Sequence, residues 1–318
     1  MRPKCLVVAK SQETIAAQDA IIASIKKHAD VDVITTTEMI KNQGKYTQEK
    51  WYAALVTLGG DGAVLKAVSI YTPKLGGSYL AAYIDKLGDE HTEMHSYSET
   101  GKKREFYAIG GCGTYVPLVF AFDQGYRGRL CNIRRNSFPL ALSSLIDYLK
   151  SSAADRIVMP QVLKRHRFAV NGCIYAMNEI YIFAKEKGFL DNFEVKIDDQ
   201  YVHKNLRCDG VIICTDAGSS GYNASALGPV VFSGLECMVI TTVCPADRRV
   251  SPIVLGNRQK IRIRSMNPNQ KLAAIIDGCL RVEDFIFAIE DDGAGSVMFA
   301  DFSEAPRYQD FVSSIQEK

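Results

Sequence analysis

The stretch ALVTLGGDGAVLKAV, from Ala54 to Val68, constrains the fold of this chain more than any other. Its first half is an apolar run typical of a buried strand, and its second half has the apolar spacing of a helix. Between them the chain passes through Gly-Gly-Asp-Gly. A strand that turns directly into a helix predicts a parallel sheet with flanking helices. The free backbone N–H groups at the start of such a helix also favour anions.

The segments around this turn repeat the alternation of strand and helix. CLVVAK, VDVITTT and WYAALVTL are predicted strands, and the segment that begins at Ser11 is a predicted helix with a capping residue at its start. FPLALSSLIDYLKSS, from Phe138, is a further predicted helix. We therefore assign residues 1–150 to an α/β domain with a parallel sheet.

After about Arg156 the pattern changes to many short strand-like runs separated by turn residues. Asn171-Gly172 lies between two such runs and predicts a β-hairpin. This texture predicts a mainly-β sandwich domain over 151–292. The tail, 293–318, is ambiguous as sequence, and one place for it is against the α/β domain.

Composition narrows the class of protein. The chain has 318 residues, of which 47% are hydrophobic and 23% are charged, as in ordinary soluble proteins, and its net charge of +2 gives no reason to expect nucleic acid or a membrane as partner. No apolar run reaches the roughly 20 residues of a membrane helix, and the N-terminus lacks the pattern of a signal peptide. The nine cysteines show no paired spacing. We expect a cytoplasmic protein, and an organelle remains open.

A long polar segment, Gly76–Tyr107, interrupts the α/β pattern. Loops of this length are usually functional lids or disordered segments. His91 and His95 stand four residues apart in it, a spacing that would place both on one face of a helix. Two histidines without a third ligand are more ordinary as surface residues, so we predict no metal site built by the chain itself. The role of the insert stays open.

Asp61, inside the glycine turn, needs an explanation, because a carboxylate would repel the phosphate that the turn favours. It could hold a divalent metal, or accept a proton from an attacking hydroxyl. A turn aspartate that caps the helix is the plain alternative. Gly60 and Gly62 would let a ligand approach the backbone closely.

Two further stretches carry polar groups beside apolar strands. In MNEIYIF, Asn178 and Glu179 interrupt a strand and must find hydrogen-bond partners. In CDGVIICTDAGSSGYNASALGPVV, a strand leads into a loop of small polar residues around Tyr222. Such a loop suits a nucleotide or a sugar, and a polar surface loop is the alternative.

Together, Gly59-Gly60-Asp61-Gly62, Asn178-Glu179 and the segment from Asp209 to Pro229 resemble the motifs of the NAD kinase family in order and spacing. The resemblance spans roughly 55–255. The glycine turn alone is shared with lipid kinases and phosphofructokinases, whereas the other two motifs are far more specific. The family fold, an α/β domain and a β-sandwich domain with the site between them, agrees with the pattern of the sequence.

The resemblance implies ATP-dependent phosphorylation of the 2′-hydroxyl on the adenosine ribose of NAD, with Mg²⁺ or another divalent cation. Asp61 would accept the proton from that hydroxyl or orient it. The other implied binding residues are Gly60 and Gly62 for phosphates, Asn178 and Glu179 for ribose and adenine, Asp209 for the nicotinamide end, and Ser220, Gly221, Tyr222 and Ser225 for the adenosine pocket. Lys66, one helical turn after Asp61, would meet a phosphate or simply face solvent.

The chain also departs from the family pattern. Ala63 replaces a threonine after the glycine turn, and Arg129 stands where the family has an aromatic residue in Gly-x-x-Gly-Phe-Leu. Asp216 replaces a proline and would add a negative charge near an anionic ligand. These changes fit a distant enzyme and also fit a member with lost or altered activity. We favour an active kinase, because Asp61 and Tyr222 remain together with the acidic and amide residues of the other motifs.

Two alternatives stay open. One is a catalytically weakened protein that binds NAD or NADP for regulation. The other is a kinase of a lipid or sugar substrate that uses the same glycine turn, against which the retained Asn178-Glu179 pair argues. Family members are usually oligomeric, so a homo-oligomer, dimer or tetramer, is expected. The preference between NAD and NADH and the identity of the phosphoryl donor do not follow from the sequence.

Overall fold

The computed structural model describes residues 2–41, 52–69, 80–84, 90–94, 116–124, 129–152, 157–172, 174–185, 190–232, 234–291, 293 and 295–302, with 80–84 and 90–94 described by their backbone alone. The chain divides into two compact units. The first comprises Met1–Tyr71, Tyr115–Arg165 and Val297–Asp310. The second comprises Thr72–Thr114, His166–Ser296 and Phe311–Lys318.

The first unit is built on a six-stranded sheet with strand order β2-β1-β3-β6-β20-β7. Its strands are β1 (Lys4–Ala9), β2 (Asp30–Thr35), β3 (Ala54–Gly59), β6 (Leu118–Asp123), β7 (Val162–Arg165) and β20 (Val297–Ala300). β1 pairs in parallel with β2 and β3, and β3 with β6. β20 runs parallel to β6 and antiparallel to β7. The predicted α/β fold with a parallel sheet is confirmed.

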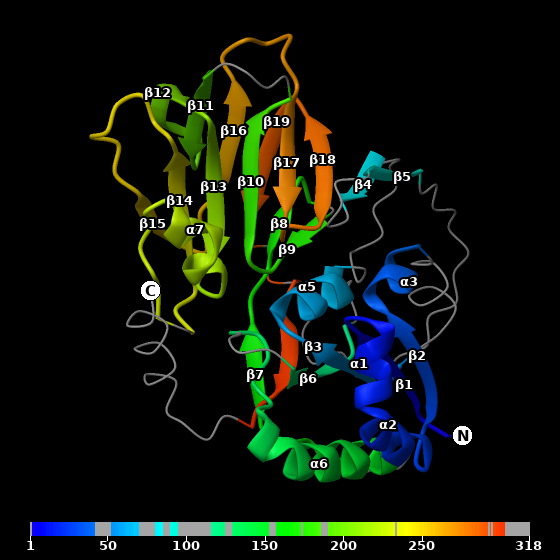
Figure 1. Cartoon of the computed structure of the whole chain (residues 1–318). Coiled ribbons are helices and arrows are strands. Elements are labelled where there is room, and N and C mark those ends of the chain that lie inside the picture. Colours follow the sequence, from blue (N-terminus) through cyan, green and yellow to red (C-terminus); the bar gives the residue numbers. More distant parts are fainter. Residues whose placement is uncertain are drawn as a thin grey trace. The chain divides into compact units, whose positions relative to one another are not determined.

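Helices cover this sheet. They are α1 (Gln12–Ala17), α2 (Asp19–Lys26), α3 (Thr36–Lys41), α5 (Asp61–Ser69) and α6 (Phe138–Ser151), with a short 3-10 turn η1 (Arg135–Ser137) before α6. Apolar residues of α2 and α6 pack on alternate residues of the strands, while α5 contacts β3 and β1. Figure 1 shows α5 and α6 on opposite sides of the sheet.

Two predicted helix starts have local causes in the sequence. The side chain of Ser11 caps α1 by accepting the backbone N–H of Thr14. A proline stands in the first turn of α6, where its missing N–H has no cost. The helix expected from Phe138 is therefore confirmed.

The second unit contains two antiparallel sheets, with strand orders β15-β14-β13-β10-β17-β18-β4-β5 and β12-β11-β16-β19-β8-β9, which Figure 1 draws as two layers. The strands of the first sheet are β4 (Leu80–Ile84), β5 (Glu90–Met94), β10 (Glu179–Ala184), β13 (Gly210–Thr215), β14 (Cys237–Val243), β15 (Ile253–Gly256), β17 (Leu272–Ile276) and β18 (Leu280–Asp284). Those of the second are β8 (Phe168–Val170), β9 (Ile174–Ala176), β11 (Asp191–Ile197), β12 (Gln200–Cys208), β16 (Ile261–Ser265) and β19 (Ile286–Glu290). A 3-10 turn, η2 (Gly218–Ser220), and a four-residue helix, α7 (Tyr222–Ser225), follow β13.

The predicted mainly-β second domain is confirmed by these sheets. Asn171 and Gly172 both have positive φ, of 50° and 67°, and connect β8 to β9 as the predicted hairpin turn. Among the described residues no helix is long and apolar enough to cross a membrane. The described cysteines carry free thiols, most of them buried.

Parts of the insert Gly76–Tyr107 are described. β4 pairs with β18 and β5 pairs with β4, so the insert extends the first sheet of the second unit. His91 belongs to strand β5, and the idea that it shares a helix face with His95 is therefore wrong. His95, the rest of the insert, the glycine cluster 110–113, the glycine-rich segment 125–128 and residues 303–318 lie outside the described residues.

Candidate functional site

The Gly-Gly-Asp-Gly turn lies at the carboxyl end of β3, where α5 begins at Asp61. Gly59 has no room for a side chain, because a Cβ there would lie 2.8 Å from the Cβ of Ala63. Gly60 and Gly62 would meet nothing within 4 Å if a Cβ were added, and neither has a positive φ. Local packing does not require these two glycines, so their bare backbone stays accessible to a ligand.

The carboxylate of Asp61 accepts three consecutive backbone N–H groups from the segment after β6. Its Oδ2 accepts from Arg129 at 2.7 Å, and its Oδ1 accepts from Leu130 at 3.0 Å and Cys131 at 3.1 Å. Burial raises the pKa of Asp61 above its ordinary value, although the three hydrogen bonds act in the opposite direction. The Cys131 side chain contributes a further hydrogen bond that also lowers this pKa. The raised pKa suits a group that accepts a proton.

Two departures from the family pattern leave this arrangement intact. Arg129 contributes its backbone N–H to Asp61, which any side chain at this position would allow. Ala63 is buried against Gly59 in the first turns of α5, where its methyl group fits. Lys66 lies half-buried in the last turn of the same helix. The chemistry of Asp61 is therefore supported by main-chain contacts rather than by the altered side chains.

In the second unit the Asn178-Glu179 pair lies at the start of β10, beside the end of β13. The backbone N–H of Thr215 donates to the carbonyl of Asn178 at 2.9 Å, and its hydroxyl donates to the carbonyl of Met177 at 2.6 Å. Gly218 follows so closely that a Cβ there would lie 2.1 Å from the carbonyl oxygen of Asn178. The Asn178-Glu179 pair and the loop after β13, almost 40 residues apart in the sequence, are therefore in direct contact.

Both polar side chains of the pair have a buried oxygen without a partner. Within the described residues, neither Oδ1 of Asn178 nor Oε2 of Glu179 has a hydrogen-bond partner. Oε2 faces Gly221, whose Cβ position would be 3.5 Å away. Burial, with a smaller contribution from the nearby Asp277 carboxylate, raises the pKa of Glu179 to about 8. Because buried polar atoms are normally paired, these two oxygens mark a place where a ligand is expected.

Aromatic and acidic residues adjoin this pair. The rings of Tyr181 and Tyr222 meet edge to face with centroids 5.2 Å apart, and the Tyr181 hydroxyl lies 3.5 Å from the carbonyl oxygen of Asp209. Tyr222 is 40% exposed, and Asp209 and Ser225 are also exposed, whereas Ser220 is half-buried. The expected binding residues on either side of β13 therefore carry polar groups that are at least partly exposed.

Two polar residues of the same loop are used by the fold instead. The Ser219 hydroxyl donates to the Asp216 carbonyl and accepts the N–H of Val231. The Asn223 amide donates to the carbonyl of Ser219 and accepts the hydroxyl of Thr241. Both side chains are fully buried, so the abundance of hydroxyl and amide groups in this loop partly reflects its internal bracing.

Asp216 also has a structural partner. Its side chain is buried, and its Oδ2 accepts the backbone N–H of Gly234 at 2.7 Å. The carboxylate thereby anchors the segment that follows α7 to the loop that follows β13. The replacement of the family proline by this aspartate is thus accompanied by a hydrogen bond that proline cannot accept.

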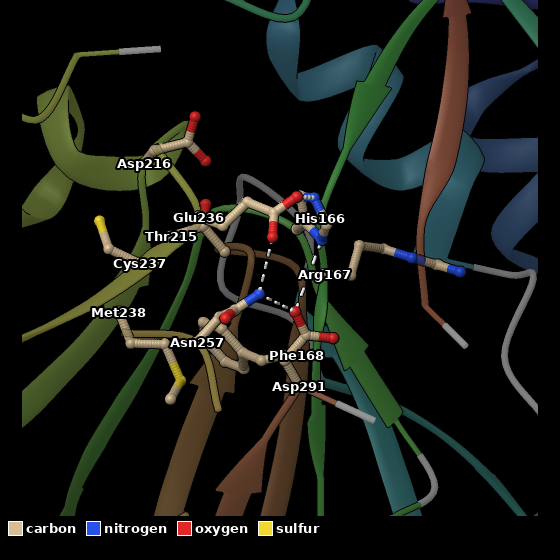
Figure 2. Close-up of a pocket in the computed structure, with 10 residues that line it drawn as sticks. All are labelled: His166, Arg167, Phe168, Thr215, Asp216, Glu236, Cys237, Met238, Asn257 and Asp291. Atoms are coloured by element: carbon tan, nitrogen blue, oxygen red, sulfur yellow. Dashed lines mark hydrogen bonds and ion pairs between the residues drawn. The ribbon is translucent and has the colours of Figure 1, made fainter. Parts of the chain in front are cut away.

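The segment between α7 and β14 is also held near its carboxyl end, where Glu236 lines a small pocket of the second unit. Figure 2 shows Glu236 and Asp291, each of which interacts with both His166 and Asn257. His166 lies 2.6 Å from Glu236 and 3.5 Å from Asp291, and the Asn257 amide donates to both carboxylates. In the part of the chain that is described, no group of three histidine, cysteine or acidic side chains is arranged to hold a metal ion. We therefore give this pocket a structural role: its hydrogen bonds and ion pairs at Glu236 hold the same segment that Asp216 binds at Gly234.

Asp277 is the residue that the sequence did not reveal. It lies in the turn between β17 and β18, and its fully enclosed carboxylate accepts the backbone N–H groups of Met177, Asn178 and Glu179 at distances of 2.7 to 3.2 Å. Asp277 and Gly278 have φ of 49° and 65°, and with Cys279 they form the hairpin turn between the paired residues Ile276 and Leu280. Asp-Gly between two strands signals such a turn, but nothing in it signals contact with residues 100 positions earlier.

Parts of the chain are similar to known NAD kinases. The family model for the ATP-NAD kinase C-terminal domain matches residues 177–285. The NAD kinase of Syntrophotalea carbinolica is 30% identical over 167 residues, which cover 52% of this chain and 57% of that protein. The NAD kinase of Methanothermobacter thermautotrophicus is 35% identical over 103 residues, which cover 32% of this chain and 36% of that protein. The chain therefore spans less than two thirds of these two relatives.

Solved structures resemble the fold over a greater length. The NAD kinase from Archaeoglobus fulgidus in complex with ATP superimposes with a TM-score of 0.68 at 19% identity, covering 99% of both chains. Yeast NADH kinase complexed with NADH gives a TM-score of 0.67 at 18% identity, covering 99% of this chain and 86% of that one. Residues 177–285, which contain the Asn178-Glu179 pair and the loop after β13, are therefore similar to the C-terminal domain of the ATP-NAD kinase family, and the chain as a whole has the fold of these solved NAD kinase structures.

Proposed function

We propose that this protein is an NAD kinase, which transfers the γ-phosphoryl group of ATP to the 2′-hydroxyl on the adenosine ribose of NAD and so makes NADP. The observation that carries this proposal is the pair of buried oxygens, Oδ1 of Asn178 and Oε2 of Glu179, that lack partners among the described residues. A nucleoside offers amino, ring-nitrogen and hydroxyl groups that match them. The accessible groups of Asp209, Ser220 and Tyr222 with Ser225 would line the rest of the dinucleotide site.

In this proposal Asp61 accepts the proton of the 2′-hydroxyl, or orients that hydroxyl, as it attacks the γ-phosphorus. Its carboxylate is held in position by three backbone N–H groups. Gly60 and Gly62 present bare backbone at the start of α5, where phosphate oxygens are favoured. Phosphoryl transfer needs positioning and charge stabilisation rather than a covalent nucleophile.

A divalent cation, Mg²⁺ in our proposal, would enter with ATP. The described part of the chain offers no cluster of side chains that would hold such an ion by itself, and Mg²⁺ is commonly held by phosphates with only one or two carboxylates. The ion would neutralise charge on the transferred phosphoryl group. Lys66, in the last turn of α5, is a second candidate for a phosphate contact.

A ligand panel distinguishes this proposal from its alternatives. The shift in melting temperature is measured with NAD, NADH, NADP, ATP, and a mixture of lipid and sugar acceptors, and NADP formation is then assayed with ATP and Mg²⁺. NAD binding with turnover supports the proposal. Dinucleotide binding without turnover supports a regulatory protein, and turnover of another acceptor supports a different kinase. We further propose a cytoplasmic homo-oligomer, which size-exclusion chromatography with light scattering would check.

Changing Gly62 to alanine should move stability and substrate affinity in opposite directions. Gly62 is exposed in the first turn of α5, with nothing near its Cβ position, so Gly62→Ala should raise the free energy of unfolding by about 0.5–1 kcal/mol. The added methyl group would stand where phosphate oxygens approach, so the KM for ATP should rise about tenfold. Unfolding in urea and steady-state kinetics measure the two effects. An unchanged KM for ATP would exclude a phosphate from this position.

A further inference from the structure

The Asp277 carboxylate is hydrogen-bonded to the backbone at the start of β10. Met177 N–H lies 3.1 and 2.9 Å from its two oxygens, and its Oδ1 also accepts Asn178 N–H at 2.7 Å and Glu179 N–H at 3.2 Å. In return, the N–H of Asp277 donates to the Glu179 carbonyl at 2.9 Å. A buried charge is stable only with such a set of donors, and this set is made by the backbone that carries the Asn178-Glu179 pair.

Backbone carbonyls in the same segment, 177–179, are contacted by the end of β13 and the loop that follows it. Thr215 holds the carbonyls of Met177 and Asn178, and Gly218 presses on Asn178 from the same side. The backbone of 177–179 is thus held by the β17–β18 turn through its N–H groups and by the end of β13 through its carbonyls. The side chains of Asn178 and Glu179 are left with the buried, unpartnered oxygens described above.

We propose that Asp277 is a positioning residue for nucleotide recognition, whose carboxylate holds the backbone of 177–179 so that the side chains of Asn178 and Glu179 meet the bound dinucleotide. The inference rests on the proposed function for the identity of the ligand. The hydrogen bonds between Asp277 and the backbone of 177–179, which we call the brace, do not depend on which ligand binds.

The brace also has an electrostatic consequence. Two carboxyl groups lie close together in a buried setting, and their surroundings differ. Asp277 has its backbone donors and the nearby Arg167 guanidinium, which together oppose the effect of burial and leave its pKa at about 6. Glu179 has burial and the Asp277 charge, which raise its pKa to about 8. At neutral pH Asp277 is therefore ionised, and Glu179 is protonated and donates a hydrogen bond to an acceptor on the nucleotide, such as a ring nitrogen.

The charged groups around the pair come from few elements. Asp277 belongs to the β17–β18 turn, and Arg167 precedes β8 and donates to the carbonyl of Gly295. The loop after β13 presents the backbone of Gly221 to Glu179, while its own acidic residue, Asp216, is bonded to Gly234. As pH rises through about 8, Glu179 loses its proton and can no longer donate, so NAD affinity should fall.

Two substitutions separate position from charge. Asp277→Ala removes the brace and leaves three buried N–H groups unpaired, so the affinity for NAD should fall about tenfold or more. Asp277→Asn keeps Oδ1, which accepts three of the four hydrogen bonds, but removes the charge. In this variant Glu179 should ionise at lower pH, so the loss of NAD affinity should begin about one pH unit or more earlier. Glu179→Gln cannot ionise, and its NAD affinity should not change between pH 7 and 9, where Asp277 stays ionised.

The experiment is a calorimetric titration with NAD from pH 6 to 9, together with carbon NMR of protein labelled at the glutamate carboxyl carbon. A glutamate resonance that titrates above pH 7, is absent in Glu179→Gln and shifts to lower pH in Asp277→Asn supports the inference. The inference is overturned if no such resonance exists, if Asp277→Asn leaves it unmoved, or if a folded Asp277→Ala binds NAD like the wild type. The NMR arm needs no ligand, so it stands even if the wild type fails to bind NAD, a result that would instead remove the proposed function.

Discussion

Asp61→Asn should lower the turnover number by about 10²–10⁴ while leaving NAD affinity within a few fold of the wild type. The asparagine keeps the shape of the side chain and the oxygen that accepts Leu130 and Cys131 N–H. It cannot take up the proton of an attacking hydroxyl. Single-turnover kinetics with saturating ATP and NAD measure the chemical step, and calorimetry measures NAD binding.

The substitution also has a structural cost that the experiment must separate. The new amide NH₂ group would face the N–H of Arg129, so one buried donor loses its acceptor at a cost of about 1–3 kcal/mol in the free energy of unfolding. Asp123→Asn is a matched control, because Asp123 is a buried acid at the end of β6 that pairs with Arg134. It should lose stability by a similar amount and retain most of its turnover. Equal turnover in Asp61→Asn and the wild type would remove Asp61 from the mechanism.

Gly218→Ala should abolish detectable NAD binding and lower the free energy of unfolding by about 3 kcal/mol or more. Its Cβ would lie 2.1 Å from the carbonyl oxygen of Asn178 and 2.5 Å from the carbonyl carbon. That carbonyl cannot turn away without breaking its hydrogen bond to Thr215 N–H. Either the loop after β13 or the start of β10 must move, and the buried oxygens of Asn178 and Glu179 that we propose to bind the nucleotide move with them.

A second glycine variant shows whether the effect is specific to this contact. Gly60→Ala adds the same methyl group where nothing lies within 4 Å, so it should leave the free energy of unfolding nearly unchanged. Urea unfolding of both variants, followed by calorimetric titration with NAD, compares them directly. A Gly218→Ala protein with the stability and NAD affinity of the wild type would show that the two motifs are not in close contact.

The sequence predicted those parts of the structure that depend on local patterns. The strand–turn–helix around Asp61, the capping of α1 by Ser11 and the hairpin at Asn171-Gly172 all follow from residues within a few positions of one another. Hydrophobic periodicity was enough for the parallel sheet, because β1, β3 and β6 are buried on both faces and read as continuous apolar runs.

Contacts between distant segments could not be predicted in this way. Val297–Ala300 reads as an isolated apolar run, and its pairing with β6 joins Phe299 to Val119, 180 positions earlier. The sequence also did not show which polar residues of the loop after β13 are used by the fold. Ser219 and Asn223 resemble ligand-binding groups in the sequence, but they form hydrogen bonds with Val231 and Thr241. Asp277 was missed for the same reason. Its Asp-Gly sequence predicts only a local turn, whereas its carboxylate accepts backbone N–H groups about 100 positions earlier in the chain.

Following the γ-phosphoryl group shows whether the protein makes NADP from ATP and NAD. The wild-type protein is incubated with ATP, Mg²⁺ and NAD, ADP is quantified, and NADP is measured with a dehydrogenase that accepts only the 2′-phosphorylated dinucleotide. We expect one NADP for each ADP, with the rate of formation of both products lowered about 10²–10⁴-fold in Asp61→Asn. ADP without NADP, or NADP formed equally by the wild type and Asp61→Asn, would contradict this expectation.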